Sequence, residues 1–149
     1  MSKRKTPSGA ELANLVTDAR EKSLALLEGL SDEQMLGSPS SIVNPLLWEI
    51  GHLAWFAERG ILRHLRNEKP LLHQTDMFYD SMAVRHDTRW DLPLPTKQET
   101  LDYMKRVLDR VVKIIGDQES PDEDDLYFYQ MVGFHEYMHA EAFPYTRQT

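Results

Sequence analysis

Two histidines four residues apart, His135 and His139, lie near the end of this 149-residue chain. Side chains at positions i and i+4 of a helix project from the same face, one turn apart. A third histidine, His52, lies far upstream within a strongly apolar segment. Two imidazoles from one helix and one from a neighbouring helix can bind a metal ion and leave coordination positions open for water, dioxygen or substrate. The residue types and their spacing therefore predict a three-histidine metal site.

Two other interpretations of these histidines compete with a shared site. The pattern His-Glu-x-x-His also occurs in zinc metalloproteases, which take a third ligand from further along the chain. Glu141 is the one acidic residue after His139, and it lies too near on the same helix to be that ligand. His52 taken alone is explained as a buried histidine that hydrogen-bonds a backbone carbonyl or a carboxylate. Three histidines on two apolar helices, in a chain without cysteine, favour the shared metal site.

The composition restricts the class of protein. The chain has 17 basic and 24 acidic residues, and its net charge of −7 argues against nucleic acid as the main partner. No apolar run approaches the roughly 20 residues that span a membrane, and no secretory signal is recognisable. Because there is no cysteine, metal ligands must come from His, Asp and Glu. We expect one cytoplasmic domain over residues 1–149, with no membrane or nucleic-acid partner.

Hydrophobic periodicity predicts four helices that would position the histidines. The segment between the second and third has no helical period and is predicted as one long ordered loop, which in compact domains usually has a function. The fold class is therefore all-α, a four-helix bundle whose metal sites are built inward from facing helices. The predicted helices cover residues 8–30, 44–66, 96–115 and the segment from 120 past 139, and the loop covers residues 67–95.

Several residues predict where these helices begin and which side faces solvent. Asn44 precedes a proline and is expected to cap the second helix. Thr96 and Ser120 each begin a capping-box sequence, so the third and fourth helices are expected to start there. Pro144 lies inside the fourth pattern and is expected to bend that helix. Glu58 is expected on the solvated side of the second helix.

Three segments of the chain resemble the DinB-like domain of ergothioneine-biosynthesis sulfoxide synthases and of the related selenoneine synthases. They are the helix around His52 (residues 44–58), the loop at residues 79–95, and the segment from His135 to the end of the chain. The resemblance implies a DinB-like four-helix bundle in which His52, His135 and His139 hold a non-haem Fe(II). Members of the family use dioxygen to join a sulfur or selenium donor to the imidazole carbon of hercynine, which is trimethylated histidine.

The resemblance also implies substrate-binding residues. In similar enzymes the long loop helps to hold the carboxylates of the donor. Arg85 and Arg89 are the candidates here, because guanidinium pairs bidentately with carboxylate. An ion pair between Arg89 and a neighbouring aspartate, Asp87 or Asp91, is an equally good interpretation. Some relatives carry a glutamine that touches hercynine at position 138, and Met138 cannot make that hydrogen bond. No catalytic residue is assigned.

Members of this family carry a second, larger domain that resembles formylglycine-generating enzyme and supplies much of the substrate pocket. We therefore expect residues 1–149 to be the N-terminal part of a longer protein, binding metal without a complete active site. The predicted function is the Fe(II)-binding domain of a hercynine-dependent, O2-using enzyme that forms a C–S or C–Se bond. Two alternatives remain open: a stand-alone DinB-like metal-dependent thiol transferase, and a non-catalytic helical bundle.

Overall fold

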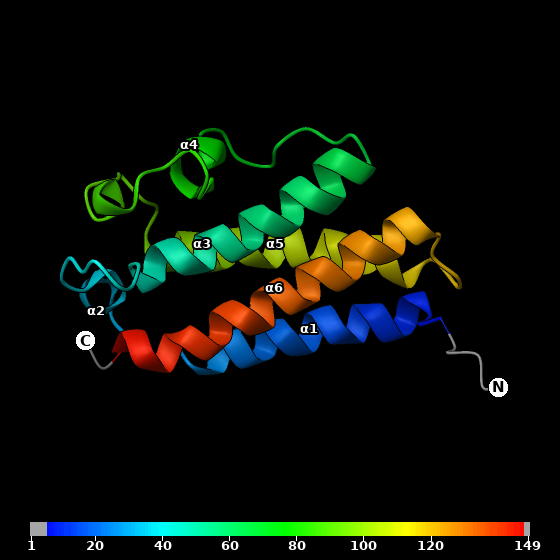
Figure 1. The fold of residues 1–149 in the computed structure, drawn as a ribbon, viewed down its shortest axis with the longest axis horizontal. Helices are drawn as coiled ribbons and strands as arrows, with labels where there is room; N and C mark the ends of the chain where they lie inside the picture. The colour runs from blue at the N-terminus through cyan, green and yellow to red at the C-terminus, as the bar shows by residue number, and fades with distance from the viewer. Residues whose placement is uncertain (1–5, 148–149) are drawn as a thin grey trace.

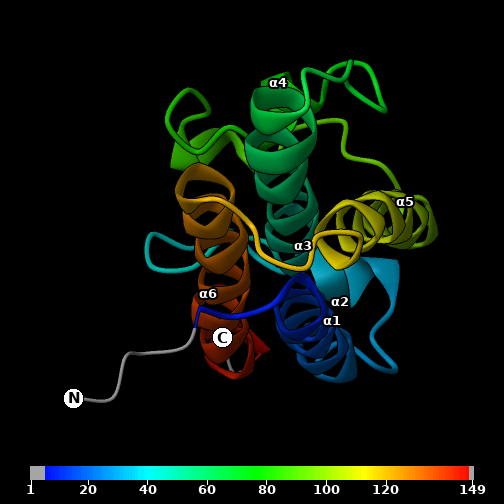
Figure 2. The same ribbon diagram turned by 90° about the vertical axis from the view of Figure 1, so that its right-hand side faces the viewer.

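Four long helices form the bundle in the computed structural model, which describes residues 6–147 and the side chains of residues 6–144 (Figures 1 and 2). Helices α1 and α3 each pack against both α5 and α6. The described residues contain no β-strand, so the predicted all-α class is confirmed. The long helices are α1 (Gly9–Ala25), α3 (Leu46–Ala57), α5 (Lys97–Gly116) and α6 (Glu123–Arg147).

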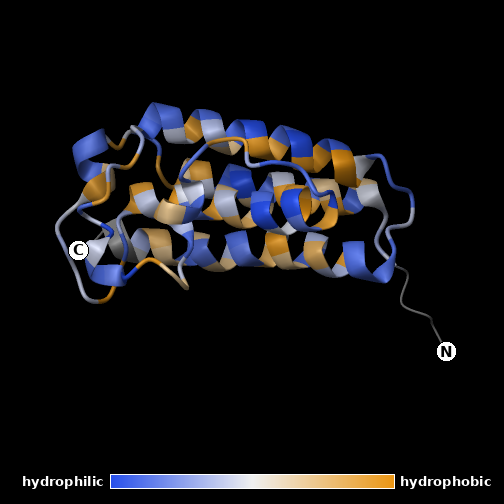
Figure 3. Ribbon diagram, turned by 90° about the horizontal axis from the view of Figure 1, so that it is seen from above, coloured by the Kyte–Doolittle hydropathy of each residue, from blue (hydrophilic) through white to orange (hydrophobic). Residues whose placement is uncertain are grey.

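Apolar side chains from all four helices fill the core. Figure 3 shows apolar and polar residues interspersed along the helices, as expected where each helix buries part of its surface. None of the described helices is long and apolar enough to cross a lipid bilayer. The largest core side chains are fully buried and include Trp48, Ile50, Ile115, Tyr129 and Phe143.

Helix α3 is buried almost all round its circumference, as its sequence predicts. Every residue in it except Phe56 is buried. Helix α3 continues directly into the π-helix η1 (Glu58–Leu65). The two elements together occupy most of the span predicted as one helix, residues 44–66. Because the helix is buried on so many sides, each of its polar side chains needs a hydrogen-bond partner within the protein.

The predicted exposure of Glu58 is wrong, because this carboxylate is completely buried. It lies one turn beyond Ala54, on the face of the helix that packs against α5. Its two oxygens accept hydrogen bonds from the Tyr103 hydroxyl and from the backbone N–H of Leu71, both at 2.7 Å. These partners come from α5 and from the long connection, and neither is visible in the local pattern around Glu58.

The connections contain short helices that the sequence analysis missed. Helix α1 ends at Ala25 rather than near residue 30, and a separate short helix, α2 (Asp32–Leu36), follows it with a capping box of its own at Ser31. The long connection over residues 67–95 holds α4 (Thr75–Tyr79) and the 3-10 turn η2 (His86–Thr88). Helices of one turn are too short to produce a recognisable hydrophobic period, which explains the error.

The ends of the long helices agree only in part with the predictions. The capping box at Thr96 is present at the start of α5. At the start of α3 the N-cap residue is Pro45, and Asn44 donates to the carboxylate of Glu49 instead of capping the helix. The capping box predicted at Ser120 is also wrong, since α6 begins at Glu123.

The side chain of Asp122 explains the later start of α6, because it accepts the backbone N–H of Asp125 at 2.8 Å as an N-cap does. A carboxylate at this position competes with the hydroxyl two residues earlier, and both are good cap residues. At the other end, α6 runs through Pro144 to Arg147.

A buried ion pair fixes how α6 lies on α1. The Nε of Arg20 donates to Glu136 at 2.6 Å, and both side chains are almost completely buried. A second nitrogen of Arg20 donates to the backbone carbonyl of Met104 in α5 at 2.8 Å. Because Glu136 directly follows His135, this pair helps to set the face of α6 that turns toward α3.

The long connection folds back across the outer side of α3, as Figures 1 and 2 show for the part that carries α4. The indole N–H of Trp48 donates to the backbone carbonyl of Phe78. The ring of Tyr79 lies directly over Gly51, where a Cβ atom would come within 2.3 Å of it. Glycine at this position therefore allows the connection to approach the backbone of α3.

We predict that Gly51→Ala destabilises the protein by about 1–3 kcal/mol, the usual cost of overpacking a core. The Tyr79 ring would have to move, and its backbone would move with it. Chemical denaturation followed by circular dichroism measures the effect. Gly116→Ala in α5 is the matched control, because nothing lies within 4 Å of its added methyl group. That control should be neutral or more stable by up to about 1 kcal/mol. Equal stability of the two variants would contradict the close approach.

Candidate metal centre

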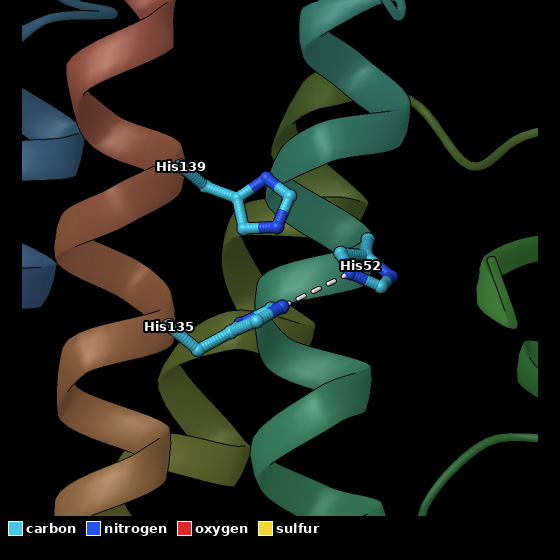
Figure 4. Close-up of side chains that lie close together, drawn as sticks. All are labelled: His52, His135 and His139. Atoms are coloured by element: carbon cyan, nitrogen blue, oxygen red, sulfur yellow. Dashed lines mark hydrogen bonds between the residues drawn. The ribbon is translucent and has the colours of Figure 1, made fainter.

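Three histidines converge between α3 and α6. His52 comes from the middle of α3, and His135 and His139 come from successive turns of α6 (Figure 4). One ring nitrogen from each of the three lies within 4.8 Å of the other two. His52 is buried, whereas the other two are partly exposed. The structure thus brings together the three residues that the sequence analysis singled out.

Two neighbours fix the orientation of His52. Its Nδ1 lies 2.7 Å from the backbone carbonyl oxygen of Tyr79. A carbonyl only accepts hydrogen bonds, so Nδ1 carries the hydrogen and the neutral ring has its lone pair on Nε2. The ring also stacks on Trp48, with centroids 4.8 Å apart and planes 10° from parallel. Nε2 is therefore held toward α6, where it lies 3.3 Å from Nε2 of His135.

A buried carboxylate orients His139 in the same way. Nδ1 of His139 lies 2.7 Å from one oxygen of Glu49, and Asn44 donates to the other oxygen at 2.6 Å. Burial alone raises the pKa of Glu49, but the hydrogen bonds from His139 and Asn44 outweigh it and hold the pKa below its ordinary value. The ionised carboxylate accepts from Nδ1–H, which leaves Nε2 of His139 free to bind a metal.

Sequence reasoning missed Glu49, although a signal was present. It is a charged residue one turn before His52 in a helix that is otherwise almost entirely apolar. A charged side chain at such a position needs a buried partner, and that partner is His139.

His135 and His52 have rings that stay neutral in the folded protein. The ring of His135 stacks on Phe56 with centroids 3.7 Å apart. Burial, together with the nearby His139 and His52, lowers the pKa of His135 to about 3. Burial also lowers the pKa of His52. Neutral imidazole is the form that binds metal, so no proton has to be displaced from these two rings near neutral pH.

The geometry fits a divalent transition metal. Metal–nitrogen bonds of about 2.1 Å place neighbouring ligand nitrogens roughly 3.0–3.4 Å apart in tetrahedral or octahedral sites. The 3.3 Å between Nε2 of His52 and Nε2 of His135 is already within that range. The ligand nitrogen of His139 lies no more than 4.8 Å from the other two and would have to move closer for all three to bind one ion. Three neutral imidazoles suit iron, zinc or copper and leave the full positive charge of the ion for anionic ligands.

An apolar hollow opens beside His135 on the outer face of α6. Phe134 and Met138 form part of its wall, and their side chains are 60% and 61% exposed. Phe56 and Met131 line this hollow and also a second one, whose other walls include Trp55, Arg59, His64 and Asp80. The histidine cluster therefore borders an open surface that is wide enough for a small molecule.

The two loop arginines lie away from this surface. Arg85 is exposed and pairs with Asp87 at 2.9 Å. Arg89 is buried, and it bonds the side chain of Asn44 and two loop carbonyls instead of Asp87 or Asp91. Neither arginine lines the two hollows, and their predicted role in holding carboxylates stays a prediction. Arg59 is the guanidinium that does line the second hollow.

Comparisons with known proteins agree with this description. The family model described as the DinB superfamily matches residues 15–143. Hercynine oxygenase from Mycolicibacterium thermoresistibile is 26% identical over 138 residues, which cover 91% of this chain. The enzyme of the same name from Mycolicibacterium smegmatis is 26% identical over 133 residues, or 88% of the chain. In both cases the match covers 30% of the length of the relative.

A hydrogen-bonded aspartate holds the Trp55 wall of the second hollow. Asp76 accepts the indole N–H of Trp55 at 2.6 Å and pairs with Arg63 through both carboxylate oxygens. The hydrogen bonds from Arg63 lower the pKa of Asp76 to about 2, against the opposing effect of burial. The ionised carboxylate thus ties α4 to η1 at the edge of the site.

We predict that Asp76→Asn lowers stability near neutral pH and that this difference shrinks as the pH falls from about 4 toward 2. The pKa is about 2 in the folded protein and 3.8 ordinarily. The unfolded chain therefore takes up the proton first, and the contribution of the carboxylate is lost in that window. Denaturation of both proteins between pH 7 and pH 3 measures how their difference in stability changes with pH.

Asp109→Asn, at an exposed pair with Lys105, is the control and should change stability by at most about 0.5 kcal/mol. A difference independent of pH would contradict this assignment.

Proposed function

Because the chain belongs to the DinB superfamily, we propose that it is the metal-binding part of an enzyme related to hercynine oxygenase. In this proposal His52, His135 and His139 bind Fe(II). The observation that carries it is the convergence of three imidazoles, two of them oriented by a hydrogen bond to the nitrogen that would not bind metal. The chain spans only 30% of the length of the relatives, so the reaction of the whole enzyme is part of the proposal.

The proposed reaction joins a thiol or selenium donor to hercynine with dioxygen. Bound Fe(II) would supply open coordination positions and the redox capacity that oxygen chemistry needs. The residues of this chain would hold the ion and shield it. Trp48 and Phe56 pack against the rings of His52 and His135 and exclude water from that side. The apolar hollow beside His135 would accept the flat imidazole ring of a substrate. In this proposal the rest of a longer protein, like the part of the relatives outside the match, would complete the pocket.

We predict that this chain, titrated with Fe(II) without oxygen, binds close to one equivalent. His52→Ala, His135→Ala and His139→Ala should each weaken binding by more than about 100-fold, since losing a ligand costs more than losing its outer partner. His64→Ala is the matched control, because His64 lies about three turns beyond His52 and contacts Phe128 rather than the cluster. Stoichiometric binding in any of the three ligand variants would remove that residue from the site.

We also predict that hercynine raises the melting temperature of the Fe(II)-loaded protein and leaves that of His52→Ala unchanged. A ligand that binds only the native state must stabilise it. Histidine, which lacks the three methyl groups of hercynine, is the control ligand and should raise the melting temperature less. If hercynine has no effect, the hollow of this chain does not take the substrate by itself, even where the metal binds. Metal-dependent consumption of a thiol in the absence of oxygen would point instead to a thiol transferase.

A further inference from the structure

A chain of hydrogen bonds connects the long loop to the metal centre. Nη1 of Arg89 donates to Oδ1 of Asn44 at 2.7 Å, and Nδ2 of Asn44 donates to Glu49 at 2.6 Å. The other oxygen of Glu49 lies 2.7 Å from Nδ1 of His139. Arginine only donates and an ionised carboxylate only accepts, so the amide of Asn44 can be oriented in one way alone. The three bonds therefore have a fixed direction from the loop to His139.

A second contact connects the same arginine to His52. The guanidinium carbon of Arg89 lies 3.9 Å from the centre of the Trp48 ring, a close cation–π contact. The ring of His52 also stacks on Trp48, nearly parallel, with the ring centroids 4.8 Å apart. Arg89 is thus linked to His139 through a chain of hydrogen bonds and to His52 through the Trp48 ring, without contacting either histidine directly.

The loop in turn is wrapped around Arg89. Nη2 of Arg89 donates to the backbone carbonyls of Ser81 and Val84, at 3.3 and 2.8 Å. Arg89 is 7% exposed, and no carboxylate among the described side chains pairs with it directly. A buried guanidinium is costly unless its donors are satisfied, and Nη1 and Nη2 of Arg89 find their acceptors only with Asn44 and the loop in place. Its Nε is buried without a hydrogen-bond partner among the described residues, and the face of the guanidinium lies on Trp48.

We propose that Arg89 is a positioning residue for the metal centre, holding Glu49 through Asn44 and His52 through Trp48. The proposal rests on the proposed metal site and gives Arg89 a different role from carboxylate binding. Docking of the loop and binding of metal then stabilise each other, because a coupling between two sites is reciprocal. Loss of Arg89 frees the Asn44 amide to rotate and removes the support on one face of Trp48.

Co(II) affinity and absorption test the proposal, since its visible spectrum reports ligand geometry. Arg89→Met should bind Co(II) about 10–100-fold more weakly, as changes to outer partners of ligands do, and should alter the spectrum. Arg85→Met is the matched control in the same loop and should bind within about twofold of the parent. Asn44→Ala keeps the Arg89 contacts to the loop and to Trp48 and removes only the link to Glu49. It replaces Arg89→Met if that variant does not fold, and it should also bind Co(II) more weakly than the parent, whereas parental affinity would overturn the proposal. Affinity equal to the parent in a folded Arg89→Met protein overturns the proposal.

Nitrogen-15 NMR of the metal-free protein at a fixed pH separates this proposal from the metal site itself. In the parent and in Arg85→Met, His139 should be the Nδ1–H form bonded to Glu49. In Arg89→Met that signal should broaden or give way to a mixture of tautomers. An unchanged His139 signal in Arg89→Met overturns the positioning role. Absence of metal binding by the parent overturns the proposed function alone, because the NMR comparison needs no metal.

Discussion

A buried imidazole needs a partner for each of its nitrogens, and much of this structure follows from meeting that need at His52. The side chain is 3% exposed in a helix that is apolar on nearly every face. Its Nδ1 is satisfied by the Tyr79 carbonyl, which obliges the long connection to fold back over α3. Gly51 leaves the space that this approach requires. Its Nε2 faces His135, so α6 must lie against α3 in one register.

The buried acidic residues serve the same end by joining elements that are distant in sequence. Glu136 ties α6 to α1 through Arg20, and Glu49 ties α3 to α6 through His139. Glu58 joins η1 to α5 and to the start of the long connection. Such groups add little net stability over apolar residues of the same size, but each is costly to leave unpaired. They therefore favour one packing of the helices over the alternatives.

The sequence predicted the features that local patterns encode and missed those that depend on distant partners. The helical period predicted the all-α bundle, the run of apolar residues agrees with the burial of α3, and the local sequence at Thr96 predicted its capping box. The pairing of His135 with His139, and their meeting with His52, also followed from spacing and apolar context. The burial of Glu58 and the engagement of Arg89 by Asn44 had no local signal, because each depends on atoms 13 to 45 residues away. The local pattern predicts that Glu58 is exposed, whereas its partners from α5 and the long connection enclose it.

The order in which the centre assembles follows from where its parts lie along the chain. His52 and His135 are 83 residues apart, so their meeting closes a long loop of chain and comes only after α3 and α6 have docked. Local helices can form before that, but none of them contains a complete ligand set. An ion bound at a site that forms late in folding stabilises the native state more than the folding transition state. It would slow unfolding and leave the folding rate nearly unchanged, so its benefit would be measured in the lifetime of the folded protein.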